Sequence, residues 1–569
     1  MTANSDDSRS SPTLAGTFFE KWPVFAAACF ALVLAFAMKL PCLLGQWGPP
    51  GYLQYKSVCY TDLMPLYGLR GLDRNELPYV ENKTYEYPAV IGLEMWAASF
   101  LASDYKSFFL ANIPFLAGAG LIAVYALTKA LGARWRRALL FAAAPPFVFY
   151  AFHNWDLLAV APVALAAWAW KNRRHEAVGF FLGVGAAAKV FPVLGLAPLS
   201  LAAAMSGGSG RGGISRIEEV GLPSNGDPRW HIDFGAAFRL VAGFVAAWLA
   251  FNLPLMTLEL LARGNIEGWL AVYRFHSRRT PDFGTLWYWW AELAAKPRVP
   301  SLIRSAGVAL ALAPVLFAVV LVHRWISRRS ALLARPSTRS DDSYACTRSE
   351  WGPASTGSEA RPASRGSEYG PGLGWIEAVV GIGIFEGVVI AGELTGAAQA
   401  GPTSPSFKSF VDGASLLLVG ISSLWLVGRQ WRYRLSPWAT FGALTCAFLL
   451  FSKVHSPQYA IWLLVFFALS PTYPAYLVGY FLSDAILLVS GFWWFATAPD
   501  LSANFWRAVF AVAVVARALF LGLLMLGFSG VKNDYVGATS ESDRLEFGWQ
   551  AAGSPASETR WALDGGGKP

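Results

Sequence analysis

Residues 25–44 read FAAACFALVLAFAMKLPCLL, a run in which Lys39 is the only charged residue. A helix needs about 20 such residues to cross the roughly 30 Å hydrocarbon core of a bilayer. Further apolar runs of similar length follow along the chain, at 108–131, 238–256, 302–322 and 508–528. These runs predict an all-α, polytopic membrane protein.

The composition of the 569-residue chain favours the same class, because 55% of its residues are hydrophobic and only 15% are charged. Soluble domains average about 25% charged residues, which excludes a single soluble globular domain. The formal net charge of +9 fits basic cytoplasmic loops, and nucleic acid is not an expected partner. Six His and five Cys also exclude a Cys/His metal scaffold.

The positions of the basic residues predict the topology. Basic clusters recur at 134–137, 171–174, 324–329 and 429–434, and basic loops usually stay on the cytoplasmic side. This places residues 1–22 inside as an N-terminal tail and residues 45–106 outside as a long first loop. The transmembrane domain is expected at 23–529, with about 14 crossings, although counts of 11 to 13 are equally compatible with run lengths near the bilayer thickness.

Some parts of the chain do not fit a plain series of crossings. Residues 177–204 carry Lys189 and Pro192 near their centre, and we expect two short helices that meet at Lys189. Segments 205–235, 327–372 and 530–569 are polar and rich in small residues. Such compositions cannot bury a core, so we expect cytoplasmic disorder there.

Cys42 and Cys59 flank the first part of the long loop. If that loop is extracytoplasmic, the two can form a disulfide that closes about 17 residues and contributes roughly 3 kcal/mol. The alternative is two free thiols.

The first outside loop holds the leading catalytic candidate, Asp62, with Tyr67 and Arg70 shortly after it. A carboxylate held at an apolar interface has a raised pKa and can serve as a general base. The alternative is that Asp62 is a turn residue or helix cap after Thr61.

Glu86 and Tyr87 follow in the same loop, just before an apolar stretch at 89–101. The topology leaves no room for that stretch as a crossing, so it is expected to lie in the interface or to be re-entrant. Glu86 is a candidate for substrate binding, and the alternative is a structural partner of Arg70 or Arg74.

A second outside loop, residues 273–290, is basic and aromatic. Arginines on that side depart from the positive-inside trend and often mark an anion site, and the flanking aromatics suit an interface where a lipid phosphate would lie. The alternative is a plain interfacial aromatic belt. The candidate phosphate-binding residues are Arg274, His276, Arg278 and Arg279.

Other polar residues are predicted on the same side and become candidates for substrate binding. A lone lysine can also extend its ammonium to the interface, so their convergence on one face is the stronger signal. These residues are Asn154, Asp156, Lys189, Lys453, His455 and Gln458.

Carboxylates, cations and an aromatic-rich apolar setting suit displacement of a lipid phosphate by a sugar hydroxyl. A carboxylate takes the hydroxyl proton, and cations stabilise the departing phosphate. A base opposite the leaving group favours inversion. No phosphate-binding or dinucleotide-binding glycine motif is present, and no Asp-x-Asp pair surrounds Asp62. We therefore expect no cofactor and no tightly held divalent metal.

Several blocks of the sequence resemble a known family. CYTD at 59–62, PLYGLRGL at 65–72 and EYP at 86–88 are similar to the first periplasmic loop of bacterial polyprenyl-phosphate-mannose-dependent mannosyltransferases. These enzymes form glycosyltransferase family 87 of the GT-C superfamily. Further resembling blocks, which extend the similarity over roughly 25–528, are NWDL at 154–157, AKVFP at 188–192, FGTLW at 283–287 and KVHSPQY at 453–459.

The resemblance implies a GT-C type helical bundle in the bacterial plasma membrane whose active site faces outside. The donor would be a polyprenyl-phosphate hexose, usually mannose, and the acceptor a glycolipid or cell-envelope glycan. The family's catalytic acidic residue maps onto Asp62, while the arginines of the second loop carry over only weakly. The polar insertion before Gly372 is atypical of the family.

Two other functions compete with this hypothesis. A transporter or flippase of lipid-linked sugars would also use a cavity and cations, but it predicts polar gating residues at both faces, whereas the sequence places them mainly on one. A non-catalytic membrane scaffold would leave the Asp62 loop unexplained. The sequence determines neither the acceptor nor the oligomeric state.

Overall fold

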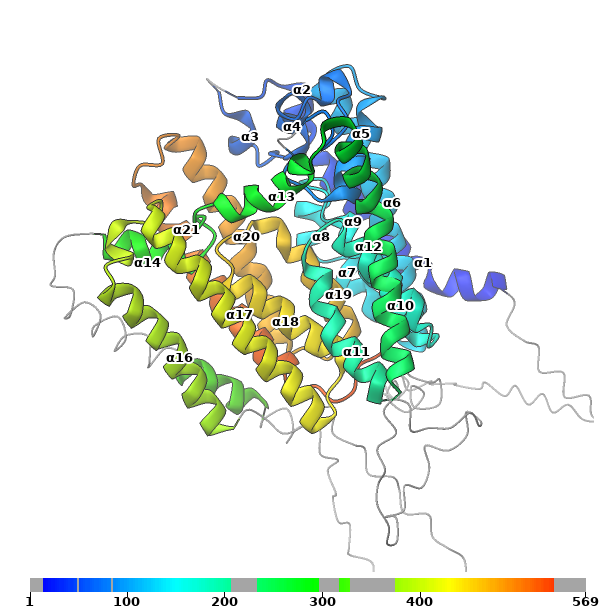
Figure 1. Ribbon diagram of the computed structural model, residues 1–569, viewed down its shortest axis with the longest axis vertical. Coiled ribbons are helices and arrows are strands. Elements are labelled where there is room, and N and C mark those ends of the chain that lie inside the picture. Colours follow the sequence, from blue (N-terminus) through cyan, green and yellow to red (C-terminus); the bar gives the residue numbers. More distant parts are fainter. Residues whose placement is uncertain are drawn as a thin grey trace, which may run out of the picture.

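The computed structural model describes residues 14–48, 51–82, 85–205, 233–295, 317–327 and 374–536, and these ranges form helices and connecting loops with no β-strand. The predicted all-α polytopic class is confirmed (Figure 1). Seven helical segments in the described ranges are long and apolar enough to cross a membrane, namely Glu20–Leu44, Tyr105–Ala142, Phe234–Arg263, Trp375–Leu394, Pro405–Tyr433, Pro474–Thr497 and Phe505–Phe528.

The ends of the long helices are set by local chemistry. Helix α6 (Tyr105–Leu131) begins at Asp104, whose side chain accepts from the backbone N–H of Ser107 in a capping box. Helix α12 (Phe234–Arg263) ends where Gly264 turns left-handed at φ 69°, a conformation that glycine adopts without strain. The expected spans therefore extend by several residues into capped ends.

The first half of the chain packs around α6. Its elements are α1 (Leu14–Ala37), α2 (Leu40–Leu44), α3 (Leu53–Lys56), α4 (Leu63–Leu69), η1 (Leu72–Arg74), α5 (Ala89–Ser99), α6, η2 (Gly132–Ala138), α7 (Leu139–Ala142), α8 (Pro145–Tyr150), α9 (Leu157–Lys171), α10 (His175–Ala186), η3 (Phe191–Gly195), α11 (Leu196–Met205) and α12. A Cβ at Gly179 or Gly183 of α10 would collide with the backbone of α12. Small residues thus allow these two helices to touch.

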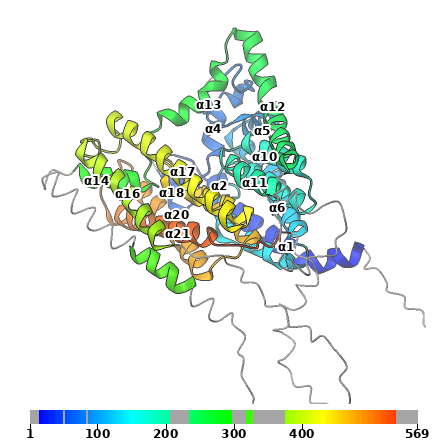
Figure 2. The same cartoon turned by 60° about the horizontal axis from the view of Figure 1, so that its bottom comes forward.

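The second half of the chain places most of its helices in a group on the left of Figure 1, although its Ala460–Leu469 helix packs against α7 and α9 of the first half. Its elements are α14 (Leu286–Ala294), α16 (Trp375–Leu394), η5 (Ala398–Ala400), α17 (Pro405–Tyr433), α18 (Pro437–Phe451), η6 (Pro457–Tyr459), α19 (Ala460–Leu469), α20 (Pro474–Thr497) and α21 (Phe505–Phe528). Helix α13 (Glu267–Arg278) leaves the end of α12 and runs towards this second group (Figure 2).

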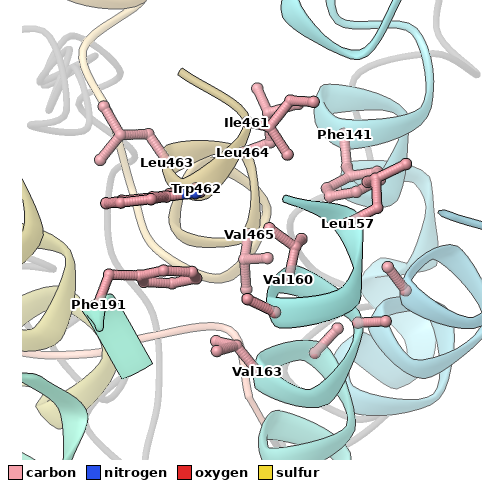
Figure 3. Packing of buried hydrophobic residues seen from close by; sticks show 14 of the residues in the cluster. Phe141, Leu157, Val160, Val163, Phe191, Ile461, Trp462, Leu463, Leu464 and Val465 are labelled. Carbon is pink, nitrogen blue, oxygen red and sulfur yellow. The ribbon is translucent and has the colours of Figure 1, made fainter. Parts of the chain in front are cut away.

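Several short apolar helices form the interior of the bundle. Every residue of α19 is buried, because a helix that is apolar on all sides is stable when other helices surround it. Trp462 stacks on Phe191 with ring centroids 4.6 Å apart, and Val465 faces Val160 (Figure 3). These short segments fill a protein core, which explains why their lengths fall below that of a full crossing.

Two predicted elements can be compared with the structure directly. The break at Lys189 is confirmed, since α10 ends at Ala186 and η3 begins at Phe191. The apolar residues at 139–152 predict an outward crossing, and this prediction is wrong as a single helix. Helix α7 ends at Ala142 and α8 starts at Pro145, because proline removes a backbone donor and clashes with the preceding turn.

The polar segments expected at 205–235, 327–372 and 530–569 lie largely outside the described residues. Residues 302–316 of the span expected at 302–322 also lie outside them. The start of the expected C-terminal tail, however, is packed against the bundle. Val531 is buried and its carbonyl accepts from the N–H of Ser436 at 2.9 Å, while the N–H of Tyr535 donates to the carbonyl of Leu469 at 2.9 Å. Residues 530–536 thus belong to the folded body, a correction to the boundary at 530.

The expected disulfide between Cys42 and Cys59 is present and joins α2 to the segment before Asp62, across a sequence separation of 17. Nearby, Lys39 is buried and its Nζ donates to the carbonyl of Tyr60 at 2.7 Å. The disulfide and this hydrogen bond both fix the backbone that leads into Asp62.

The Cys59→Ser variant is expected to unfold with a free energy about 3 kcal/mol lower, because the reduced loop gains freedom in the unfolded chain. Thermal unfolding of purified protein in detergent would measure the loss. Cys29→Ser is the matched control, since Cys29 is a free, exposed cysteine. Equal unfolding of oxidised and reduced wild-type protein would contradict the prediction.

Candidate active site

Asp62 lies directly before α4, yet its carboxylate does not cap that helix. Oδ1 accepts from the hydroxyl of Tyr60 at 2.9 Å, and Oδ2 accepts from Nδ2 of Asn154 at 2.6 Å. Asp62 thus occupies the N-cap position of α4, but its side chain forms no capping hydrogen bond. The half-buried carboxylate is instead held between side chains from two distant parts of the chain.

The backbone around Asp62 is fixed by the turn that follows α8. The N–H of Asp62 donates to the carbonyl of His153 at 2.9 Å, and the hydroxyl of Thr61 donates to the carbonyl of Phe152 at 2.9 Å. The same turn supplies Asn154. The 151–156 turn thus positions both the backbone and the carboxylate of Asp62.

Burial raises the pKa of Asp62 above its ordinary value, while hydrogen bonds from Asn154 and Tyr60 oppose the rise by stabilising the charged form. The Glu86 carboxylate adds to the rise, and the Lys189 ammonium lowers it. The net effect is a pKa of Asp62 above its ordinary value. A carboxylate with a raised pKa is a stronger base, which suits it to accept a proton near neutral pH.

Asn154 connects Asp62 to a second set of charges. Its Nδ2 also donates to the hydroxyl of Tyr87 at 2.7 Å, and its Oδ1 accepts from Nζ of Lys189 at 3.1 Å. Nζ of Lys189 lies 3.4 Å from Oδ1 of Asp156 and 4.6 Å from the ring centroid of Tyr87. The structure therefore brings together five predicted site residues in one buried network.

Glu86 forms an ion pair with Arg70, whose Nη2 lies 2.5 Å from Oε2 of Glu86. Glu86 is therefore a structural partner of Arg70, as the alternative interpretation of the sequence expects. The backbone carbonyl of Glu86 also contacts Nε2 of His276 at 2.9 Å, which brings α13 to the first loop. Tyr67 packs against Phe108, and its hydroxyl donates to the carbonyl of Ala102 at 3.3 Å. Both of these contacts of Tyr67 are with α6 and the segment before it, and neither is with the Asp62 network.

The Lys453 loop is organised by two acidic residues. Nζ of Lys453 lies 2.5 Å from Oδ1 of Asp412 and donates to the carbonyl of Ser277 at 3.0 Å. The N–H of His455 donates to the Asp282 carboxylate at 3.2 Å. His455 and Gln458 are both buried. Lys453 thus helps to join the end of α13 to this loop, and its charge is partly neutralised.

The arginines of the second loop divide into two kinds. Nη2 of Arg279 lies 3.8 Å from Oδ2 of Asp282. Arg274 and Arg278 are exposed on α13, and within the described residues neither forms an ion pair. These two arginines are the cations most accessible to an anion from solvent or from a lipid headgroup.

A groove between α12 and the start of α13 has a volume of about 480 Å³, and none of the residues that line it belongs to the Asp62 network. Its walls are mostly apolar and include Leu253, Met256, Leu260, Ile266 and Leu270. Because residues four apart share a helix face, the face of α13 that carries Leu270 continues to Arg274 and Arg278. An apolar groove is therefore followed by two cations on one side of the helix.

The sequence did not single out some of the residues that complete the site. Tyr60 stands two residues before Asp62, but its hydrogen bond depends on the local turn. Lys39 interrupts the first apolar run, and a charge at such a place is a usable signal. Trp462, whose Nε1 donates to Oδ1 of Asp156 at 2.8 Å, comes from 306 residues further along the chain, which no local pattern predicts.

Across the part of the chain that the structure describes, no group of three or more His, Cys, Asp and Glu side chains is placed to hold a metal ion. The expectation of a metal-independent, cofactor-free site stays a prediction. No family model and no curated protein matches the chain. The fold and the site define a multi-pass α-helical membrane protein with a carboxylate–amide–ammonium network formed by Asp62, Asn154 and Lys189.

Proposed function

We propose that the protein is an inverting glycosyltransferase that moves a hexose, with mannose preferred, from a polyprenyl phosphate to a glycolipid or cell-envelope glycan. The observation that carries the proposal is the Asp62 carboxylate, half-buried, raised in pKa and held by Tyr60 and Asn154. This is the arrangement required of a general base that must be both oriented and basic.

In the proposed reaction an acceptor hydroxyl attacks the anomeric carbon of the donor. Asp62 takes the hydroxyl proton as the new carbon–oxygen bond forms. The bond between the anomeric carbon and the phosphate oxygen breaks, and the electron pair leaves with the polyprenyl phosphate. Attack from the side opposite the phosphate inverts the anomeric configuration.

The cations and the apolar groove support a lipid phosphate as donor. Arg274 and Arg278 are exposed on α13, and arginine binds phosphate through paired N–H donors. The groove at the start of α13 offers an apolar surface for the lipid tail. Together they fit a ligand with an anionic head and a long hydrocarbon chain.

The resemblance to glycosyltransferase family 87 supports mannose as the sugar and Asp62 as the base. It also supports a bacterial plasma membrane with the site at the outer face. In this orientation the basic clusters are cytoplasmic and the Cys42–Cys59 disulfide lies in an oxidising compartment.

The Tyr60→Phe variant is expected to shift the acid limb of the pH–rate profile to higher pH. The base must be deprotonated, so the rate falls as the pH drops through the pKa of Asp62. The Tyr60 hydroxyl lowers that pKa by donating to the charged form, and its removal raises the pKa. Tyr55→Phe is the control, because its ring packs against Tyr60. An acid limb that stays in place, or moves to lower pH, would contradict the assignment.

The stereochemistry of the product tests the proposed reaction. Purified protein would be incubated with a polyprenyl-phosphate hexose of known anomeric configuration and an envelope lipid extract, and the new linkage determined by nuclear magnetic resonance. The proposal predicts the opposite anomer. Retention of configuration would exclude a single displacement with Asp62 as base.

A further inference from the structure

The turn at 282–285 and the turn at 452–456 are bound to each other through Asp282. The N–H of Asp282 donates to the carbonyl of Lys453 at 3.0 Å. Its carboxylate accepts from the N–H groups of Gly284, at 3.0 Å, and His455, at 3.2 Å. One carboxylate thus holds both turns, which carry the adjacent cations Arg279 and Lys453.

Arg517 of α21 is hydrogen-bonded to the same two turns. Its Nη2 donates to the carbonyl of Gly284 at 2.9 Å and to the carbonyl of His455 at 3.3 Å, and the side chain is 1% exposed. A Cβ on Gly284 would collide with the His455 carbonyl. The close approach of the two turns therefore requires glycine at 284 and a donor at 517.

Arg517 is paired with Asp484 of α20, with Nη1 3.6 Å from Oδ1. Oδ2 of Asp484 accepts from the hydroxyl of Tyr150 at 2.8 Å. Tyr150 is the last residue of α8, directly before the 151–156 turn that holds the Asp62 backbone and carboxylate. A continuous series of contacts thus runs from the turn that holds the base to the turns that carry the cations.

A charged pair inside apolar helices is costly to bury, and apolar replacements of such pairs are often as stable. The contacts of the Asp484–Arg517 pair with Tyr150, Gly284 and His455 explain why α20 and α21 contain it. Asp484 and Arg517 are 0% and 1% exposed, so neither is available to a substrate. Their hydrogen bonds to Tyr150 and to two backbone carbonyls set the relative positions of three turns.

We infer that Asp484 and Arg517 are a positioning pair that sets the placement of the Asp62 base relative to the cations of the 279–285 and 452–456 loops. The inference rests on the proposed function for its effect on catalysis. Its structural part, a clamp on the two loops, stands on the contacts alone.

The test replaces the pair with apolar residues, as Asp484→Leu combined with Arg517→Met, so that no unpaired charge is left in the bundle. We expect a folded, monodisperse protein in which kcat for hexose transfer falls at least about 30-fold while KM for the donor changes less than about threefold. Backbone amides at 282–285 and 453–456 should exchange hydrogen at least about tenfold faster, because they lose their clamp.

Ser483→Ala is the matched control. Ser483 precedes Asp484 and is also buried, but its hydroxyl donates to the carbonyl of Tyr480 within α20. It should leave both kcat and loop exchange unchanged.

Two results would overturn the inference: a folded double variant with wild-type kcat, or one whose loop amides exchange at the wild-type rate. If wild-type protein transfers no hexose, the proposed function fails by itself. The exchange measurement then still decides the clamp, since unchanged loop exchange rejects it and faster exchange supports it.

Discussion

Replacing Asp62 with asparagine is expected to lower the rate of hexose transfer about 10³-fold, within the range that general-base catalysis contributes. The amide has nearly the same shape and can still hydrogen-bond to Tyr60 and Asn154, the two partners of the carboxylate. It cannot accept the acceptor's proton. The loss should therefore appear in kcat, with the protein folded and donor binding retained. Steady-state transfer of radiolabelled sugar by purified protein measures it.

Asp73→Asn is the matched control for this variant. Asp73 lies in the same loop, is 42% exposed at its side chain, and its Oδ2 lies 3.6 Å from Nη1 of the exposed Arg74. Exposed pairs contribute little, so wild-type activity is expected. A folded Asp62→Asn protein that transfers sugar at the wild-type rate would show that Asp62 is not the base.

Lys189→Met is expected to lower the free energy of unfolding by about 3–5 kcal/mol, the usual result of removing one member of a buried pair. The ammonium is 10% exposed and lies 3.4 Å from the Asp156 carboxylate, which is 1% exposed. Without the Lys189 ammonium, the buried Asp156 carboxylate keeps the hydrogen bond from the Trp462 N–H but has no cation beside it. Asn154 also loses a donor. Thermal unfolding in detergent should show a lower midpoint, and transfer activity should fall with it.

Adding Asp156→Asn to Lys189→Met is expected to restore most of the stability. The neutral amide removes the uncompensated charge, and its oxygen can still accept from Trp462. Activity should not return, because the cation beside Asn154 is still missing. A Lys189→Met protein with the wild-type melting temperature would show that the pair contributes nothing to the fold.

Much of the fold follows from local sequence. The apolar runs predict the long helices because length and hydropathy decide whether a helix can cross a bilayer. The break at Lys189 follows from a charge and a proline in an apolar run. Pro145 carries the same kind of signal, yet the hydropathy of residues 139–152 alone predicts one span. Its effect on α7 and α8 shows that proline outweighs hydropathy at this position.

The site was only partly predictable. Asp62, Asn154 and Lys189 are polar residues beside apolar runs, and their cost in such a place makes them visible in sequence. Tyr67 lies in the same loop as Asp62 and is an equally plausible candidate from sequence, but in the structure its ring packs on Phe108. Residues that act through distant partners leave no local pattern. Arg517 contacts Gly284 across 233 residues, and the direction of its side chain depends on how α21 packs against α20.

Hexose transfer itself is tested with purified protein in proteoliposomes that contain radiolabelled polyprenyl-phosphate-mannose and an envelope lipid acceptor. We expect the label to move into a new covalent glycolipid or glycan, and this transfer to depend on Asp62. If the label instead crosses the bilayer still attached to polyprenyl phosphate, with no covalent product, the protein is a carrier of lipid-linked sugars and not a glycosyltransferase.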